Sequence, residues 1–389
     1  MARRRRVAWF VAGLIAVLVI VLTFRAGRRP WPEPLLSTDL ERQGREVFRD
    51  ETFGDEKFWT DTARLHDVID RELQPIEALR LGLKVDLDRL NLLQFVLHNP
   101  LATSGTEELL RQNAVVGIRG TFDDGGNLVR VGITCALCHS TVDNALLPGI
   151  GHRLDGWPNR SLEVGRILAM LPVFTPEQKE VLRRWPRGTY DPRFNADGMS
   201  TPLVLPPAYG LAQVDNETYT AEGPISYWNA YVAVTQMHGQ GNFADPRIGV
   251  GIVQTPDLVT PRLAALRAYQ HALPAPRDDA AAPGGAAARG KLVFDGACAR
   301  CHVGGSGTDN NAGVLHDPAE TGMNADYANR TSQKRYRTTP LRGLRHHPPY
   351  FHDGSARTLT DVVAHYERVQ RLAFTESQRS DLVAYLESL

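Results

Sequence analysis

The sequence lacks an excess of charge of either sign. Lysine and arginine total 44, as do aspartate and glutamate, so the formal net charge is +0 at pH 7. No overall electrostatic field therefore recruits an acidic partner, and we expect no nucleic-acid binding. Apolar residues are not scarce, because 42% of the 389 residues are hydrophobic. This content excludes a disordered protein and, together with the length, predicts two or three globular domains.

Cysteine is scarce, and its four residues all fall in two copies of one pattern, Cys135-Ala136-Leu137-Cys138-His139 and Cys298-Ala299-Arg300-Cys301-His302. In C-x-x-C-H, two thiols add to the vinyl groups of a haem and the adjacent histidine coordinates the iron. A zinc site would need further ligands at metal spacing, and a thioredoxin-like redox pair has no histidine here. The sequence thus predicts two covalently attached haem c groups, with His139 and His302 as proximal iron ligands.

An uncharged apolar run occupies residues 7–24, after four consecutive arginines. Its eighteen residues are just enough for a helix that spans a bilayer. A cleavable signal usually has a shorter apolar region and a small-x-small cleavage site, which residues 21–24 do not offer. Haem c is attached outside the bacterial cytoplasm. We therefore expect an uncleaved anchor in the inner membrane, with the bulk of the chain in the periplasm.

The region before the first haem motif shows helical and hairpin patterns. Apolar residues recur at helical spacing between residues 56 and 96, which predicts two or three helices. Residues 115–122 and 127–134 flank the turn sequence at 123–126, which predicts a β-hairpin that leads the chain into Cys135. Beyond the motif, residues 190–223 are rich in proline, glycine and asparagine. We expect a long structured loop that covers the haem.

Capping patterns mark two further helices. Thr175 and Gln178 form a capping box before a helix expected to run to about Trp185, and Thr375 and Gln378 form another before the last helix. In that last helix the apolar residues on one face are Leu382, Leu386 and Leu389. Residues 274–290 lack large apolar side chains and indicate a domain linker. The hundred residues after the linker match the size of a monohaem cytochrome domain.

These observations predict a mainly α fold with two cytochrome c-like haem domains. The first is elaborated with a β-hairpin and long loops, and a transmembrane helix precedes it. The predicted divisions are a cytoplasmic basic segment (1–6), the anchor (7–24), a spacer (25–39), an N-terminal haem domain (40–273), the linker (274–290) and a C-terminal cytochrome c domain (291–389).

Residues 338–363, TTPLRGLRHHPPYFHDGSARTLTDVV, carry a more specific signal. Their pattern of Leu-Arg, then Pro-Tyr-Phe-His-Asp-Gly, then Thr-Leu before a helix resembles the bacterial di-haem cytochrome c peroxidase family. That family includes a related methylamine-utilisation enzyme that oxidises tryptophans. The resemblance implies that the distal ligand of the second haem lies fourteen residues beyond the motif histidine, His352. This position is occupied by Tyr366.

Helical spacing places Tyr366 independently. Leu359, Val362, Val363 and Tyr366 fall on one apolar face of the expected helix, so Tyr366 should point inward, whereas His365 turns away. We therefore expect Tyr366 as an iron ligand of the second haem. The alternatives are a core tyrosine with a hydroxyl partner, or ligation by His365 or Met323.

The first domain resembles the family only in architecture, since no catalytic glutamate aligns. His152, thirteen residues after His139, and His238, among glycines that would allow a close approach to a haem face, are the candidate distal and catalytic residues. Either histidine could equally be a loop residue bonded to the backbone. Trp157 and Trp228 could pack on a haem, although ordinary aromatic packing explains them as well.

We interpret the chain as a peroxidase-like di-haem oxidoreductase. The site at His139 would meet peroxide or oxygen and the other would relay electrons from a small redox protein, such as a monohaem cytochrome or a cupredoxin. The resemblance also allows a Ca²⁺ ion as a further cofactor. The alternatives are an electron carrier with both irons closed by protein ligands, and an oxygenase similar to the rubber-cleaving enzymes. An open sixth iron position separates both enzymes from the carrier.

Overall fold

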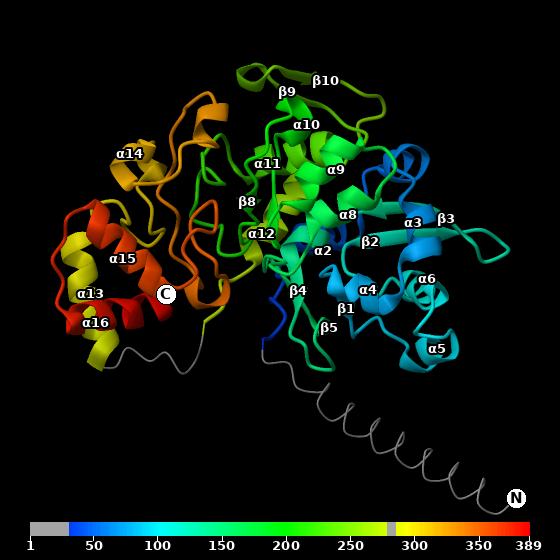
Figure 1. Cartoon of the computed structure of the whole chain (residues 1–389), viewed down its shortest axis with the longest axis horizontal. Coiled ribbons are helices and arrows are strands. Elements are labelled where there is room, and N and C mark those ends of the chain that lie inside the picture. The colour runs from blue at the N-terminus through cyan, green and yellow to red at the C-terminus, as the bar shows by residue number, and fades with distance from the viewer. Residues whose placement is uncertain (1–30, 278–284) are drawn as a thin grey trace, which may run out of the picture.

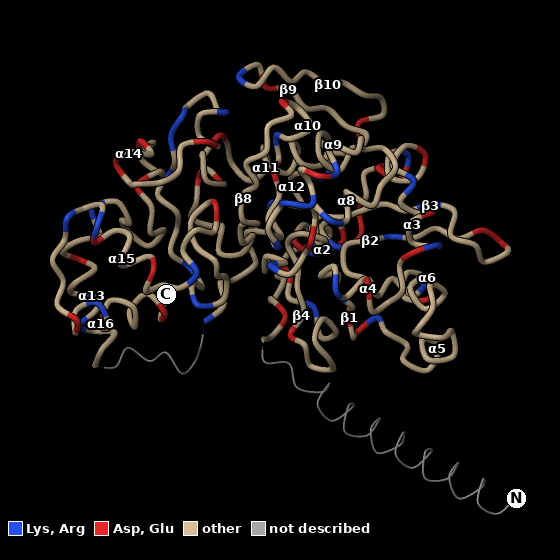
Figure 2. The backbone as a smooth tube through the Cα atoms, viewed as in Figure 1, with Lys and Arg blue, Asp and Glu red and all other residues tan. Residues whose placement is uncertain are grey.

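The computed structural model describes residues 31–277 and 285–389 (Figure 1). The described chain is mainly helical and contains five small two-stranded sheets. Basic and acidic residues are interspersed along the tube in both halves of the molecule (Figure 2), in keeping with the balanced charge. Among the described residues, no helix has the length and apolar character to cross a membrane. The expected anchor, residues 7–24, lies outside the described residues.

The N-terminal part contains eleven described α-helices: α2 (Asp39–Asp50), α3 (Leu65–Glu72), α4 (Pro75–Arg80), α5 (Leu92–Leu97), α6 (Thr103–Arg111), α7 (Ala136–His139), α8 (Val164–Met170), α9 (Pro176–Arg183), α10 (Phe194–Asp197), α11 (Ile225–Tyr231) and α12 (Leu263–Ala272). Two π-helical turns, η1 (Lys57–Thr62) and η2 (Val232–Gln236), accompany them. The expected helices between residues 56 and 96 are confirmed as α3, α4 and α5. The capping box of Thr175 with Gln178 is present at the start of α9.

Within residues 31–277 and 285–389 the strands form five pairs, of which only β1 (Val85–Asp86) with β5 (Ile150–Gly151) is parallel. The antiparallel pairs are β2 (Ile118–Phe122) with β3 (Leu128–Ile133), β4 (Ser140–Val142) with β6 (Arg153–Asp155), β7 (Thr189–Tyr190) with β8 (Leu203–Val204), and β9 (Phe243–Asp245) with β10 (Val250–Ile252). The pair β2–β3 is the predicted hairpin, and its turn is closed by a hydrogen bond from Asn127 N to Asp123 Oδ1 of 2.8 Å.

Two side chains fasten this hairpin to the segment around η1. Thr60 exchanges hydrogen bonds with the backbone of Val131, at 3.0 and 3.3 Å. The carboxyl group of Asp55, which is fully buried, accepts a hydrogen bond from the N–H of Ile133 at 3.2 Å. Because Ile133 ends β3 just before Cys135, these bonds fix the direction in which the chain enters the first motif.

A second anchor holds the strand that leaves the first motif. Ser140, the residue after His139, donates to buried Asp155 at 2.6 Å, and Tyr269 of α12 donates to the same carboxylate at 2.6 Å. Arg49 of α2 forms an ion pair with Asp155. The helices α2 and α12 meet closely enough that a Cβ at Gly44 would lie 1.9 Å from the carbonyl oxygen of Ala265. The first motif therefore stands between two tightly tied segments.

The C-terminal part is built on α13 (Gly285–Ala297), α14 (Pro318–Thr321), α15 (Leu359–Val369) and α16 (Glu376–Glu387). The helix α13 starts inside the predicted linker and leads directly into Cys298. It crosses α16 at Gly290, where a Cβ would lie 1.9 Å from the carbonyl oxygen of Asp381. The predicted capping box at Thr375 is confirmed. Leu382 and Leu386 are buried in the core of this domain, as expected.

Burial raises the pKa of Asp55 to about 9 from an ordinary value of 3.8, despite the hydrogen bond from Ile133. The unfolded chain loses this proton near pH 4 and the folded chain keeps it to about pH 9, so stability contributed by this group falls as pH rises between these values. We predict that Asp55→Asn weakens the fall in melting temperature between pH 5 and pH 8.5, measured by circular dichroism. The exposed Asp124→Asn is the control, and an identical pH dependence in both variants would contradict the prediction.

Candidate haem sites

Both C-x-x-C-H motifs are folded into a single helical turn. Cys135 precedes α7, and His139 N donates to Cys135 O at 3.2 Å. Cys298 follows α13, and His302 N donates to Cys298 O at 3.1 Å. Residues three and four apart on a helix lie on one face, so the turn brings both thiols and the histidine of each motif to the same side. This is the local geometry that attachment of one haem requires.

The two motif histidines are oriented in the same way. The Nδ1 atom of His139 lies 3.1 Å from the carbonyl oxygen of Pro206, and that of His302 lies 3.0 Å from the carbonyl oxygen of Gly307. A carbonyl oxygen can only accept, so Nδ1 carries the hydrogen and Nε2 keeps its lone pair for a metal. Burial lowers the pKa of both rings, that of His139 to about 4. Both side chains are thus neutral and fit iron ligation.

A cavity with about 1920 Å³ of atom-free space, part of it open to solvent, lies beside the second motif. Cys298, Cys301 and His302 form one wall. The helix α15, residues 316–323 and residues 336–352 contribute others, and the N-terminal part contributes Arg160 and residues 206–219. The cavity holds thiols, a neutral imidazole and large apolar walls, and its lining therefore fits a covalently bound haem.

Three candidate ligands for the other side of this iron differ in where they point. Tyr366 and Met323 both line the cavity, and burial raises the pKa of Tyr366 to about 12. His365 does not line it. Its Nε2 is 2.8 Å from Thr321 O, and its Nδ1 is 3.3 Å from Arg368 Nη2, so both ring nitrogens are engaged elsewhere. Of these three candidates, Tyr366 and Met323 are the ones that line the cavity.

The histidines near the Pro-Tyr-Phe-His-Asp-Gly sequence also reach the cavity. His352 is buried against Tyr336, with ring centroids 4.5 Å apart and its Nε2 3.1 Å from the Tyr336 hydroxyl. His347 lines the cavity as well, and burial next to Arg160 lowers its pKa to about 4. Sequence reasoning did not select His347. The paired histidines before two prolines were the available signal, but only the folded chain shows which one turns inward.

The wall between the two motifs is formed by residues 206–209. The carbonyl of Pro206 holds His139, while the side chains of Pro206, Pro207 and Tyr209 line the cavity of the second motif. Ala208 N donates to Gly156 O at 2.8 Å, which ties this wall to the residue that follows β6. This wall belongs to the long loop expected at residues 190–223, and it contacts both sites.

The two candidate distal histidines of the first site belong to different side-chain groups. His152 lies between β5 and β6, and its Nδ1 is 2.9 Å from Asp88 Oδ1. His238 follows η2 with a φ of 62° and stacks on Phe58, with ring centroids 3.6 Å apart. The two π-helical turns meet beside it, where Trp59 Nε1 donates to Met237 O at 2.9 Å. Such turns often mark functional sites, and their irregular spacing hides them from helix-period analysis.

The two candidate tryptophans also have partners. Trp157 lies in an aromatic group with Trp31, His346 and Tyr209, at centroid distances of 5.3, 5.3 and 6.0 Å. Trp228 donates from Nε1 to Glu217 O at 3.1 Å. Each therefore has the aromatic or hydrogen-bonding partners of a packed residue, and Trp157 is also next to the wall at Tyr209.

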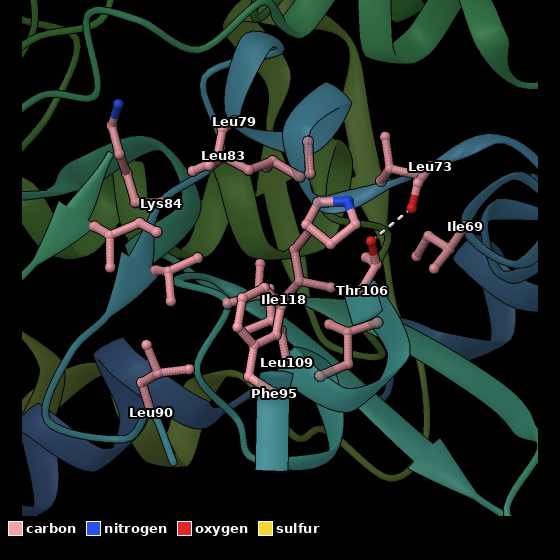
Figure 3. A pocket seen from close by; sticks show the side chains of 16 residues that line it. Ile69, Leu73, Leu79, Leu83, Lys84, Leu90, Phe95, Thr106, Leu109 and Ile118 are labelled. Atoms are coloured by element: carbon pink, nitrogen blue, oxygen red, sulfur yellow. Dashed lines mark hydrogen bonds between the residues drawn. The ribbon is translucent and has the colours of Figure 1, made fainter. Parts of the chain in front are cut away.

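Two other features of the described residues do not form redox sites. Cys301, Asp309 and His316 could together hold a metal ion, but only if the Cys301 thiol were not bonded to haem. The pocket in Figure 3 lies in the core of the N-terminal part, among Leu73, Phe95, Leu109 and other apolar side chains. Its polar Thr106 hydroxyl is satisfied by Leu73 O at 2.6 Å.

Comparisons with known proteins agree with the second site. Residues 287–389 match the cytochrome c family. The chain is 34% identical to methylamine utilization protein MauG of Methylorubrum extorquens over 160 residues, which cover 32% of this chain and 43% of that protein. It is 31% identical to the MauG protein of Methylophilus methylotrophus, over 26% of this chain and 36% of the relative.

Among solved structures, a chain of Kuenenia stuttgartiensis hydrazine synthase pressurized with xenon aligns at a TM-score of 0.36 and 20% identity, over 50% of this chain and 74% of that one. This likeness is too low to support an inference about fold.

The chain spans less than half the length of the curated relatives it matches. Residues 287–389 are a cytochrome c domain that binds haem c through Cys298 and Cys301, and the chain is a distant relative of the MauG proteins.

Proposed function

We propose that the protein is a periplasmic di-haem oxidoreductase with peroxidase-like activity, which takes electrons from a small redox protein and delivers them to peroxide. One observation carries the proposal. The carbonyl of Pro206 orients His139 at the first motif, while the side chain of the same residue lines the cavity of the second. Haems bound at both motifs would lie on either side of the segment that contains Pro206, which is the arrangement that a relay of electrons into a reactive site needs.

The two sites are suited to different tasks. The second has Tyr366 and Met323 on its cavity wall, so the chain itself offers groups that can close the sixth iron position. Bound haem supplies the redox chemistry, and a site closed by the protein relays electrons. At the first site, the hydrogen bond to Asp88 holds His152 and the stacking on Phe58 holds His238. Because these contacts already engage both candidate histidines, we propose that neither closes the sixth iron position of the first site. We therefore assign peroxide to the first site.

The reaction sets requirements on the partners. Reduction of peroxide to water consumes a pair of electrons and a pair of protons, so a one-electron donor such as a monohaem cytochrome or cupredoxin must dock twice. We propose that the apolar run at residues 7–24 holds the protein on the inner membrane. The bulk of the chain would then lie in the periplasm, since c-type cytochromes are extracytoplasmic. The Ca²⁺ ion stays a proposal from the family resemblance.

The haem content tests the second haem directly. We predict two haems per chain after acid–acetone extraction, because both motifs have the same helical turn and the same histidine orientation. The double variant with Cys135→Ser and Cys138→Ser should retain one haem. The matched double variant with Cys298→Ser and Cys301→Ser should also retain one. Pyridine haemochrome spectra give the count. A wild-type chain with one haem would refute the di-haem proposal.

The ligand role of Tyr366 predicts a spectroscopic change. Tyr366→Phe keeps the ring and removes the hydroxyl, so a tyrosine-ligated second haem should lose its ferric charge-transfer or high-spin feature and rise in potential, with the His139 haem unaltered. A core tyrosine would lose about 1 kcal/mol of stability at an unchanged spectrum. Met323→Leu is the matched test of the other cavity group, and His365→Ala is the control. An altered spectrum in Met323→Leu alone would assign the ligand to Met323.

Turnover separates the enzyme from the carrier. We predict that peroxide oxidises a reduced monohaem cytochrome in the presence of the wild-type protein, and that the rate falls to background in the variant without Cys135 and Cys138. Stopped-flow absorbance measures the rate. Turnover with oxygen but not peroxide would favour the oxygenase. No reaction with either oxidant, even after one-electron reduction, would leave the electron carrier as the function.

A further inference from the structure

Three arginines line the cavity of the second motif with unused hydrogen-bond donors. Among the described residues, no partner meets Nε and Nη1 of Arg160, Nε of Arg337 or Nη2 of Arg342, although all of these atoms are buried. A buried donor without an acceptor costs free energy, and a buried charge costs more unless it is paired. These groups therefore indicate an anionic ligand that the protein atoms alone do not supply.

The charges around this part of the cavity do not balance. Glu217 is the buried carboxylate here, and its Oε2 lies 3.3 Å from Arg337 Nη2. The other charged lining residues outside the histidines, Arg300 and Glu320, are exposed to solvent. Burial raises the pKa of Glu217, which weakens it further as a counter-charge. Three guanidinium groups against one carboxylate leave at least two positive charges uncompensated, a surplus that matches a pair of carboxylates.

Arg160 differs from the other two because it comes from beside the first motif. Its neighbour Asn159 donates from the backbone N to Cys138 O at 2.9 Å, and from Nδ2 to Leu137 O at 3.4 Å. Its own Nη2 reaches across to the carbonyl oxygen of His347 at 2.9 Å. Burial and the Arg160 charge both lower the pKa of His139 and of His347, which lie on opposite sides of the wall.

We propose that Arg160, Arg337 and Arg342 bind the propionate carboxylates of the C-terminal haem, and that Arg160 is the positioning residue through which the N-terminal part raises the potential of that haem. Oxidation adds a positive charge at the iron. A fixed positive charge in a cavity of low dielectric disfavours that oxidation. The proposal rests on the C-terminal haem alone and holds whether or not the first site is catalytic.

The test is a spectroelectrochemical titration of the full-length di-haem protein. In Arg160→Leu, the ferrous-to-ferric ratio of the C-terminal haem at a fixed potential should fall at least tenfold, which is 59 mV for one electron. Arg160→Lys should recover most of this shift because it keeps the charge. The matched control is Arg300→Leu, which removes an arginine charge next to Cys301 that is exposed and screened by solvent.

Resonance Raman spectra give a second readout that a purely structural role would not move. The propionate bending band of the C-terminal haem should shift in Arg160→Leu and in Arg342→Gln, and stay in place in Arg300→Leu. Should Arg160→Leu fail to fold, Arg160→Gln, which also removes the charge, and Arg342→Gln carry both measurements. Equal potentials in Arg160→Leu and Arg300→Leu, at full haem content and with an unshifted propionate band, would overturn the proposal.

Discussion

The hydrogen bond from His139 to the carbonyl of Pro206 is the contact on which the arrangement of the two sites depends. It leaves the Nε2 lone pair of His139 available for a metal, and it also fixes the segment that separates the two sites. The same segment is tied to Gly156 and lines the opposite cavity. Proline donates no backbone hydrogen bond, so Pro206 and Pro207 can border a haem cavity without leaving a buried N–H unpaired.

The strands around the first motif serve this contact. A hydrogen bond to Asp55 fixes the end of the hairpin that enters the motif, and a hydrogen bond to Asp155 fixes β4, the strand that leaves it. Both carboxyl groups are buried and both are hydrogen-bonded to groups far away in the sequence. A buried polar network of this kind costs desolvation but fixes one geometry, which a site with covalent cofactor attachment needs.

Local patterns in the sequence predicted what local interactions determine. The hairpin, the capping boxes at Thr175 and Thr375 and the inward face of α15 all follow from spacing within a few residues. Contacts across long separations could not be predicted in this way. No pattern near Arg160 in the sequence indicates that its side chain reaches His347. The π-helical turns break the apolar period by which ordinary helices are recognised.

The shared wall has a consequence for the C-terminal domain taken by itself. Residues 287–389 contain both haem-binding cysteines and the candidate ligands, but Arg160 and residues 206–219 of the cavity lining belong to the other part of the chain. Cut away from that part, the domain would present one edge of its cofactor to water. A hydrated edge favours the more highly charged ferric state, and it also gives small oxidants a wider approach to the cofactor.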